Sequence, residues 1–295
     1  MISHQEPTLE NTRYSGSERL RRIEGRHNSL LKELRQAFGR GELTASGECA
    51  IEGFRVIEEA IRSGLRFRAV FVSESGQARA AKLLPQIGSH VETVLLPDKL
   101  FAGAVPSETP QGVAALVVIK ISELDQLIEN ASSAPLLVIA GLQDPGNLGT
   151  ILRSAEAFGS AGVVLGEGTV SVYNSKVVRA SAGSVFRLAA VKADLNSLIQ
   201  TLRARGVRLV ATSSHKGTTL PQADLSRQIA IFIGNEGAGL DKKLIAEMDE
   251  LIMIPHSLRV ESLNAGIAAS IILYEAARQK TNFTTETRRH GENEG

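Results

Sequence analysis

Short apolar segments alternate with helical patterns through the second half of the chain. Six of them have the length and composition of buried strands, at Leu136–Ala140, Gly162–Leu165, Leu188–Val191, Arg208–Ala211, Ile229–Ile233 and Leu251–Ile254. Because helical patterns lie between most of these segments, the alternation predicts an α/β fold with a mainly parallel sheet that helices cover on both faces. Ligands of such sheets bind at the carboxyl ends of the strands, so the loops that follow these segments are the candidate functional loops.

A smaller α/β pattern precedes this one. Helical patterns are expected at residues 54–61 and 78–84 and near Lys99, and strands at Ala69–Val72, Val91–Leu95 and Val113–Ile119. Residues 121–135 suit a linker, because one short helical pattern is followed by Ala-Ser-Ser-Ala-Pro. We therefore expect a small α/β domain over residues 16–120 and a larger domain over 136–280. The ends, 1–15 and 281–295, are polar and aperiodic, which favours disorder.

The most basic segment lies near the N-terminus. The whole chain carries 33 Lys and Arg against 32 Asp and Glu, so an RNA-binding surface would have to come from local charge. Residues 13–40 contain eight basic and three acidic residues, and their apolar residues recur at near-helical intervals from Leu20 to Phe38. Two interpretations stay open: an amphipathic helical segment with a solvated charged face, or a surface that contacts RNA phosphates. The candidate RNA-binding residues are Arg19, Arg21, Arg22 and Arg26.

Several classes of protein are disfavoured by what the sequence lacks. One cysteine, Cys49, excludes an internal disulfide and fits a reducing compartment. The N-terminus has no apolar core of a signal peptide, and polar residues or glycine interrupt the long apolar runs, so we expect a cytoplasmic protein that does not enter a membrane. The six histidines show no metal-ligand spacing, so no metal is expected. His256 is interpreted as a solvent-facing loop residue.

The first candidate loop follows the segment Leu136–Ala140. Asp144-Pro145-Gly146 predicts a turn, Asn147 is a possible helix cap, and Gly159 is a typical helix end. Ordinary helix chemistry explains Arg153 only as a surface partner of Glu156, an exposed pair that contributes little stability.

The second candidate loop follows Ile229–Ile233 and runs from Gly234 to Leu240. Its three glycines surround Glu236 and allow the backbone to approach a ligand closely. Neither of the two common glycine motifs that bind phosphates fits this loop, which disfavours a dinucleotide or nucleoside-triphosphate site.

The third candidate loop joins the last predicted strand to a helix of small residues. The helix is expected to open on Ser262 and Asn264 and to carry Ile267, Ile271 and Tyr274 at helical spacing. An ordinary connection with Ser262 as N-cap explains this stretch by itself. A polar loop between two apolar elements is also typical of a functional site.

Together the three loops resemble the three signature motifs of the SpoU (TrmH-type) family of RNA ribose 2′-O-methyltransferases, in the SPOUT superfamily. The resemblance rests on residues 147–153, on 234–237 with Gly239, and on Ile254-Pro255 followed by residues 261–264. Residues 179–188 resemble the family's mid-domain segment. The match covers about residues 136–280. The preceding domain is similar, more weakly, to the family's substrate-binding domain through Glu52-Gly53 and residues 110–112.

The resemblance implies a trefoil-knotted α/β methyltransferase domain with a mainly parallel sheet, preceded by a small α/β substrate-binding domain. It implies S-adenosyl-L-methionine as cofactor, held by backbone groups near Gly234, Ile254 and Leu263. The catalytic residues that it implies are Asn147, Arg153, Glu236, Ser262 and Asn264. Arg153 is either the general base or the group that binds the adjacent phosphate and fixes the ribose. The family also suggests a homodimer.

The expected activity is methyl transfer to a ribose 2′-hydroxyl, with ribosomal RNA favoured as substrate. One alternative is the same chemistry on transfer RNA. A second alternative, from another class, is a non-catalytic RNA-binding or ribosome-assembly protein that keeps the fold. Calorimetry with S-adenosylmethionine separates the two classes, because only the enzyme requires the cofactor.

Overall fold

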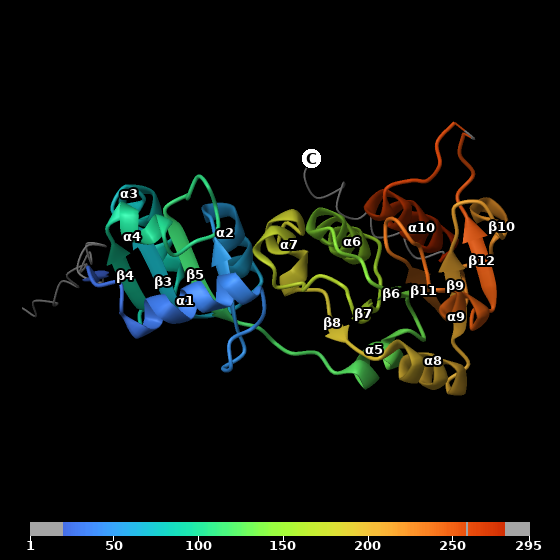
Figure 1. The fold of residues 1–295 in the computed structure, drawn as a ribbon. Helices are drawn as coiled ribbons and strands as arrows, with labels where there is room; N and C mark the ends of the chain where they lie inside the picture. The colour runs from blue at the N-terminus through green and yellow to red at the C-terminus, as the bar shows by residue number, and fades with distance from the viewer. Residues whose placement is uncertain (1–19, 258, 281–295) are drawn as a thin grey trace, which may run out of the picture.

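Two sheets, each with helices on both faces, make up the computed structural model, which describes residues 20–257 and 259–280 (Figure 1). The ends that we expect to be disordered, 1–15 and 281–295, and the candidate RNA-binding residue Arg19 lie outside the described residues.

The first domain contains a mixed five-stranded sheet. Its strands are β1 (Leu20–Arg22), β2 (Glu48–Glu52), β3 (Arg66–Ser73), β4 (Glu92–Leu96) and β5 (Val113–Val118), in the order β1-β4-β3-β5-β2. β1, β4 and β3 are parallel, whereas β5 runs antiparallel to both β3 and β2. The helices α1 (Ser29–Arg40) and α4 (Asp98–Ala102) cover one face, and α2 (Phe54–Arg62) and α3 (Gln77–Ala80) cover the other.

Three features of this domain differ from the sequence expectation. The prediction of a helical segment from the pattern of residues 13–40 is wrong for its first part, because Leu20–Arg22 is an edge strand. Helix α1 begins only after Asn28, whose side chain accepts hydrogen bonds from the N–H groups of Leu30 and Leu31. The predicted helix at 78–84 is a single turn, α3, and a separate 3-10 turn follows at Leu84–Gln86. Strand β2 was not predicted, because Glu48 and Glu52 give its buried sequence a polar appearance.

The second domain contains a seven-stranded sheet in which every neighbouring pair is parallel. Its strands are β6 (Leu136–Ile139), β7 (Gly162–Leu165), β8 (Ala190–Lys192), β9 (Arg208–Thr212), β10 (Thr218–Thr219), β11 (Ile229–Ile233) and β12 (Glu250–Met253). The six strands predicted from the sequence are confirmed. β10 was missed because two residues carry no pattern.

Helices cover both faces of this sheet, as the alternation predicted (Figure 1). On one face lie α6 (Pro145–Ala157), α7 (Ser175–Ala180) and α10 (Ala265–Gln279), and on the other lie α5 (Leu124–Asn130), α8 (Leu195–Ala204) and α9 (Lys242–Ala246). Helix α5 falls within the segment that we interpret as a linker, yet Leu127 and Ile128 are buried against the second sheet. No helix in the part of the chain that the structure describes is long and apolar enough to span a membrane.

The strand order brings the candidate loops together. The order is β10-β12-β9-β11-β6-β7-β8, so the chain builds β6, β7 and β8 toward one edge, crosses back to β9, and then inserts β11 between β9 and β6. The loops after β6 and β11 therefore leave neighbouring strands, and the loop after β12 leaves the same end of the sheet two positions from β11. Parallel sheets bind ligands at such a reversal of strand order.

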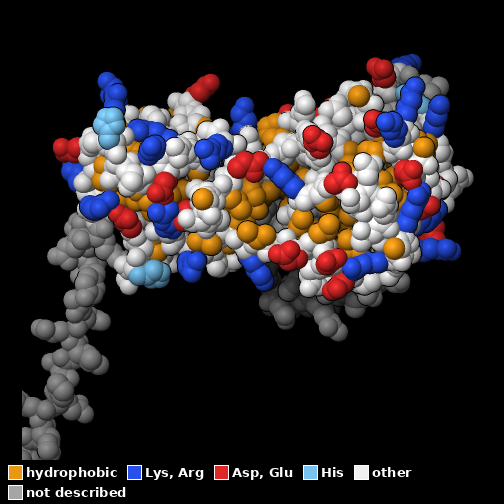
Figure 2. Space-filling view, turned by 60° about the horizontal axis from the view of Figure 1, so that its bottom comes forward, with side chains coloured by type: hydrophobic (Ala, Val, Ile, Leu, Met, Phe, Trp, Pro, Cys, Tyr) orange, Lys and Arg blue, Asp and Glu red, His pale blue; other side chains and the backbone are white. Residues whose placement is uncertain are grey.

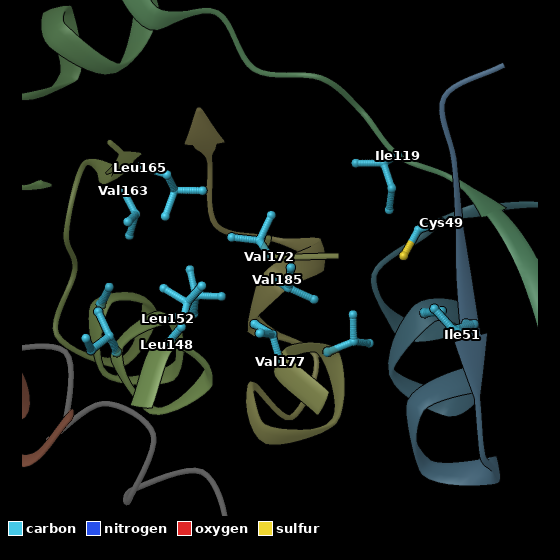
Figure 3. Close-up of a cluster of buried hydrophobic side chains, with 14 of the residues drawn as sticks. Cys49, Ile51, Ile119, Leu148, Leu152, Val163, Leu165, Val172, Val177 and Val185 are labelled. Atoms are coloured by element: carbon cyan, nitrogen blue, oxygen red, sulfur yellow. The ribbon is translucent and has the colours of Figure 1, made fainter. Parts of the chain in front are cut away.

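One apolar core runs through both domains. It extends from β7 and α6 through Val172, Val177 and Val185 to Cys49 and Ile51 of the first sheet (Figure 3). Burial in this core raises the pKa of the Cys49 thiol to about 12, so the thiol is protonated and serves packing. An ion pair of 2.6 Å between Lys192 Nζ and Glu42 Oε1 adds a polar contact between the domains.

Candidate functional site

The loop after β11 is a tight hairpin that Asn235 holds closed. The backbone N–H and C=O of Asn235 pair with those of Gly239, each at 3.0 Å. The side-chain oxygen of Asn235 accepts hydrogen bonds from the N–H groups of Gly237 and Ala238. Its side-chain Nδ2 donates to the carbonyl of Gly141 at 2.8 Å, which ties this hairpin to the end of β6. Asn235 belongs to residues 234–237, which resemble a signature motif of the family, but the sequence alone does not predict a role for it.

Glycine is required at the start of this hairpin. A Cβ atom on Gly234 would lie 2.3 Å from the carbonyl carbon of Gly239 and 2.5 Å from the nitrogen of Leu240. The same addition at Gly237 would meet nothing closer than 3.7 Å. The glycine at 234 is thus needed for the close approach of the hairpin to its own backbone, and a close approach to a ligand stays a prediction.

Asn147, Glu236 and Asn264 form one chain of hydrogen bonds between the three candidate loops. Asn264 Nδ2 donates to Asn147 Oδ1 at 2.7 Å, and Asn147 Nδ2 donates to Glu236 Oε1 at 3.1 Å. The N–H of Asp144 donates to the same Glu236 oxygen at 3.2 Å. These side chains fix one another's orientation although Asn147 lies 89 positions from Glu236 and 117 positions from Asn264 in the sequence.

The surroundings of Glu236 favour its ionised carboxylate. Partial burial would by itself raise its pKa, but hydrogen bonds from its own backbone N–H, from the Asn147 side chain and from the backbone of Asp144 and Gln143 outweigh this effect and hold the pKa below the ordinary value. An ionised carboxylate accepts hydrogen bonds only, so Glu236 acts here as an anchor for the loop after β6.

Two helix caps differ from the expectation. Asp144, rather than Asn147, caps α6, because its Oδ1 accepts the N–H of Asn147 at 2.7 Å. Asn264, rather than Ser262, caps α10, because its Oδ1 accepts the N–H of Ile267 at 3.1 Å. Asn147 is thereby free to bind Glu236 and Asn264, and Ser262 stands in the loop as an exposed residue.

A cavity of about 600 Å³ opens between the ends of β9, β11 and β12 and the start of α10. Six of the predicted site residues line it, namely Gly234, Glu236, Ile254, Ser262, Leu263 and Asn264. Asn147 reaches the cavity only through its bonds to Glu236 and Asn264. The structure thus places the second and third loops around one space and the first loop against its wall.

Other polar residues that line the cavity were not predicted as site residues. Thr212 ends β9, and Ser213 and His215 follow it; the position of this strand in the sheet could not be predicted from the sequence alone. His256 belongs to the third loop. The solvent-facing interpretation of His256 is wrong: the residue is half-buried, and its ring nitrogen Nδ1 lies 2.7 Å from the carbonyl oxygen of Ile254. The His215 and His256 rings lie 6.2 Å apart at this wall.

Arg153 lies apart from the cavity. It is exposed, and it stands six residues, or about 9 Å of helix rise, beyond Asn147 on α6. The surface pair expected with Glu156 is not formed, because Glu156 binds Arg187 instead. Among residues 20–257 and 259–280, Arg153 has no hydrogen-bond or ion-pair partner.

Helices α6 and α10 lie side by side and run in the same direction. Gly266 faces Thr150, the hydroxyls of Ser154 and Ser270 are 2.6 Å apart, and the rings of Phe158 and Tyr274 meet edge to face. The small residues of α10 allow this approach. Its stripe Ile267, Ile271 and Tyr274 faces outward, with 53%, 37% and 51% of each residue exposed.

The N-terminal arginines have acidic neighbours. Arg21 pairs with Glu92 at 2.7 Å, and Arg22 pairs with Glu24 and Glu74, whereas Arg26 is exposed. Figure 2 likewise shows Lys and Arg side chains interspersed with Asp and Glu on one face of both domains. Within the described ranges, no group of three His, Cys, Asp or Glu residues is arranged to hold a metal ion.

Comparison with known families gives two matches. Residues 134–274 match the model of the SpoU rRNA Methylase family, and residues 28–115 match the model of an MRM3-like substrate binding domain.

Two curated relatives align with nearly their whole length. One is the 23S rRNA (guanosine(2553)-2′-O)-methyltransferase RlmP of Bacillus subtilis, 31% identical over 255 residues, which are 86% of this chain and 98% of the relative. The other is the 23S rRNA (uridine(2479)-2′-O)-methyltransferase of Streptomyces viridochromogenes, 32% identical over 277 residues, which are 90% of this chain and 95% of the relative.

Two solved structures share the arrangement of both domains. The SpoU methyltransferase AviRb of Streptomyces viridochromogenes in complex with AdoMet superposes with a TM-score of 0.74 and 30% identity, over 87% of this chain and 99% of the other. An AdoMet-bound rRNA methyltransferase of Sinorhizobium meliloti superposes with a TM-score of 0.72 and 27% identity, over 88% of this chain and 98% of the other.

Proposed function

Because this chain belongs to the SpoU rRNA Methylase family, we propose that it methylates a ribose 2′-hydroxyl of ribosomal RNA with S-adenosyl-L-methionine as methyl donor. One structural observation carries the proposal: the loops after β11 and β12 line a cavity, and Asn147, in the first turn of α6, is hydrogen-bonded to a residue of each. The two relatives modify a guanosine and a uridine, so the target base is left open.

The cavity suits the proposed cofactor. Its volume of about 600 Å³ lies within the range of roughly 300–1,000 Å³ that is typical of small-molecule sites. Apolar side chains of Ile233, Ile252 and Ile272 offer a surface for a purine ring, and Glu236 and Glu261 offer carboxylates for a cationic group. Gly234, Ile254 and Leu263, which line the cavity, are the proposed backbone contacts.

The protein's own groups would orient the reactants and exclude water. The bound cofactor supplies an electrophilic methyl group on its sulfonium. Asn264, Asn147 and Glu236 hold the three loops in one geometry, and Ser262 is positioned in the loop between β12 and α10. Arg153 binds the ribose or its adjacent phosphate, since its guanidinium is exposed and has no partner among the described residues, which leaves it available for such a fork of hydrogen bonds.

A homodimer would complete this site. The exposed stripe of Ile267, Ile271 and Tyr274 is the kind of apolar surface that subunits bury. Arg153 lies on the neighbouring helix α6 and outside the cavity of its own subunit, so we propose that pairing of these helices carries Arg153 toward the cavity of a second copy.

Two further expectations belong to the same proposal. The segment from β12 to α10 threads the loops of the second domain as a trefoil knot; family membership and the return of α10 to α6 support this topology. The protein works in the cytoplasm on RNA that Arg21, Arg22 and Arg26 help to bind.

Methyl transfer to unmodified ribosomal RNA tests the function directly. RNA from cells that lack this protein is incubated with the pure protein and radiolabelled S-adenosylmethionine, and 2′-O-methyl sites are mapped. A new site in ribosomal RNA is the expected outcome. A site found only in transfer RNA would show that transfer RNA, and not ribosomal RNA, is the substrate. If the folded protein bound no S-adenosylmethionine, the non-catalytic RNA-binding protein would be the better interpretation.

A further inference from the structure

Arg187 joins the candidate catalytic helix to the first domain. Its Nε and Nη2 donate to the two carboxylate oxygens of Glu156 on α6, at 2.5 and 3.0 Å. Its Nη1 donates to Glu59 Oε2 at 3.1 Å and to Ser63 Oγ at 3.0 Å, both at the end of α2. The fork to Glu156 is bidentate, the geometry that orients a carboxylate most firmly.

Glu156 is also the natural partner of Arg153. The two residues are three positions apart on α6, a spacing at which opposite charges pair on a helix surface. In the structure this pair is absent, and the hydrogen bond to Arg187 is the main cause that lowers the pKa of Glu156. The Glu156 side chain is 30% exposed, so a carboxylate that lost Arg187 would remain partly desolvated and in need of a cation.

We propose that Arg187 is a positioning residue that occupies Glu156 and so keeps the Arg153 guanidinium free for RNA. This inference rests on the proposed function only in the last step, the use of Arg153 by the substrate. The competition between Arg187 and Arg153 for one carboxylate is a property of the chain itself.

The backbone that delivers Arg187 has an unusual conformation. Ala182 has φ of 49° and, among the described residues, is the non-glycine residue in the left-handed region, and Gly183 follows it with φ of 90°. A Cβ atom on Gly183 would lie 2.7 Å from Cβ of Glu59. For Ala182 such a conformation costs free energy and persists where the surrounding structure requires it, whereas glycine adopts it readily. Here the two residues let the turn at Ser184–Phe186 approach α2 and place Arg187 between Glu59 and Glu156.

The first test is structural and needs no activity. A crystal structure of Arg187→Gln is expected to show the Arg153 guanidinium within ion-pair distance of the Glu156 carboxylate. In the double variant Glu156→Gln/Arg187→Gln this contact should be lost. An Arg187→Gln structure in which Arg153 stays away from Glu156 would overturn the proposal.

The second test is kinetic. With unmodified ribosomal RNA, Arg187→Gln should lower kcat by about twofold to fivefold, the upper range for an exposed ion pair that competes for a guanidinium. The double variant should regain kcat, because no carboxylate is left to hold Arg153. If Arg187 merely stabilised the contact between the domains, the loss of kcat in Arg187→Gln would not be restored by adding Glu156→Gln.

Glu59→Gln is the matched control. It weakens the contact of Arg187 with α2 but leaves the fork to Glu156, so kcat should stay within about twofold of wild type. If Glu59→Gln lowers kcat as much as Arg187→Gln does, domain contact explains the effect and the proposal fails. A wild-type protein that methylates no RNA would refute the proposed function, while the crystal structures would still decide the pairing of Arg153.

Discussion

The side-chain amide of Asn264 donates a hydrogen bond of 2.7 Å to Asn147 Oδ1 while its own oxygen accepts the N–H of Ile267. One residue thus caps α10 and orients the first candidate loop. These two roles can be separated by substitution, because an aspartate keeps the capping oxygen but loses the donor.

Asn264→Asp is therefore expected to keep the melting temperature near that of wild type and to lower methyl transfer. Asn264→Ala should lower both, with a loss of about 1 kcal/mol of stability from the missing cap. Calorimetric melting and the radiolabel assay measure the two effects. Equal activity of Asn264→Asp and wild type would show that the bond to Asn147 has no catalytic role.

Gly234→Ala should abolish binding of S-adenosylmethionine. The added methyl would meet backbone atoms of Gly239 and Leu240 at 2.3–2.5 Å, so the hairpin after β11 must shift. Gly237→Ala is the control in the same hairpin, because its added methyl meets nothing within 3.7 Å. Titration calorimetry should find affinity lost in the first variant and kept within about threefold in the second.

The Glu236 anchor should fail in acid. Its pKa in the folded protein lies below the ordinary value, so the ionised carboxylate stabilises the folded state above that ordinary value, and this contribution is lost as the pH falls through the lower folded pKa. Between pH 7 and pH 3.5, the melting temperature of wild type should consequently fall further than that of Glu236→Gln. Glu167→Gln, at an exposed glutamate, should follow wild type; parallel curves for all three proteins would contradict the anchor.

Arg153→Ala is expected to lower kcat at least about 100-fold while cofactor affinity stays near wild type, because Arg153 lies outside the cavity. Arg153→Lys should recover little, since an ammonium cannot form the bidentate fork. Single-turnover methyl transfer measures the first effect and calorimetry the second. Wild-type turnover in Arg153→Ala would remove Arg153 from the reaction.

Ile267→Asp should turn a dimer into a monomer by placing a charge in the exposed stripe of α10. Ile121→Asp is the matched control, because Ile121 is also an exposed apolar residue, 65% exposed, but lies away from α10. Light scattering at micromolar concentration gives the mass of each variant. A wild-type protein that is already monomeric would contradict the proposed pairing.

The sequence predicted the second sheet well because its strands are continuous apolar runs between helical patterns. The glycines and amides at the strand ends also identified the loops. The hydrogen bond between Asn147 and Asn264 could not be predicted from the sequence, because they are 117 positions apart and only the strand order makes them neighbours. The caps were wrongly assigned for a similar reason: Asp, Asn and Ser all cap helices, and local pattern does not rank them.

The first domain was less predictable. Two buried carboxylates obscured β2. Two of their partners are distant in sequence, because Arg68 binds Glu48 and Ser107 binds Glu52, whereas Thr44 binds Glu48 from four residues away. Edge strand β1 has three residues and alternates too briefly to be distinguished from a helical stripe. Arg187 belonged to a recognised segment, but its role required the position of α2.

The apolar core that continues from one sheet to the other has a consequence for target choice. A shared apolar core and the Arg187 and Lys192 contacts join the two domains. With RNA bound to the first domain, as proposed, the RNA feature held there and the ribose presented to the cavity would be separated by a distance that the protein sets. We therefore expect the folded shape of the RNA to select the target nucleotide more than the sequence around the methylated base does.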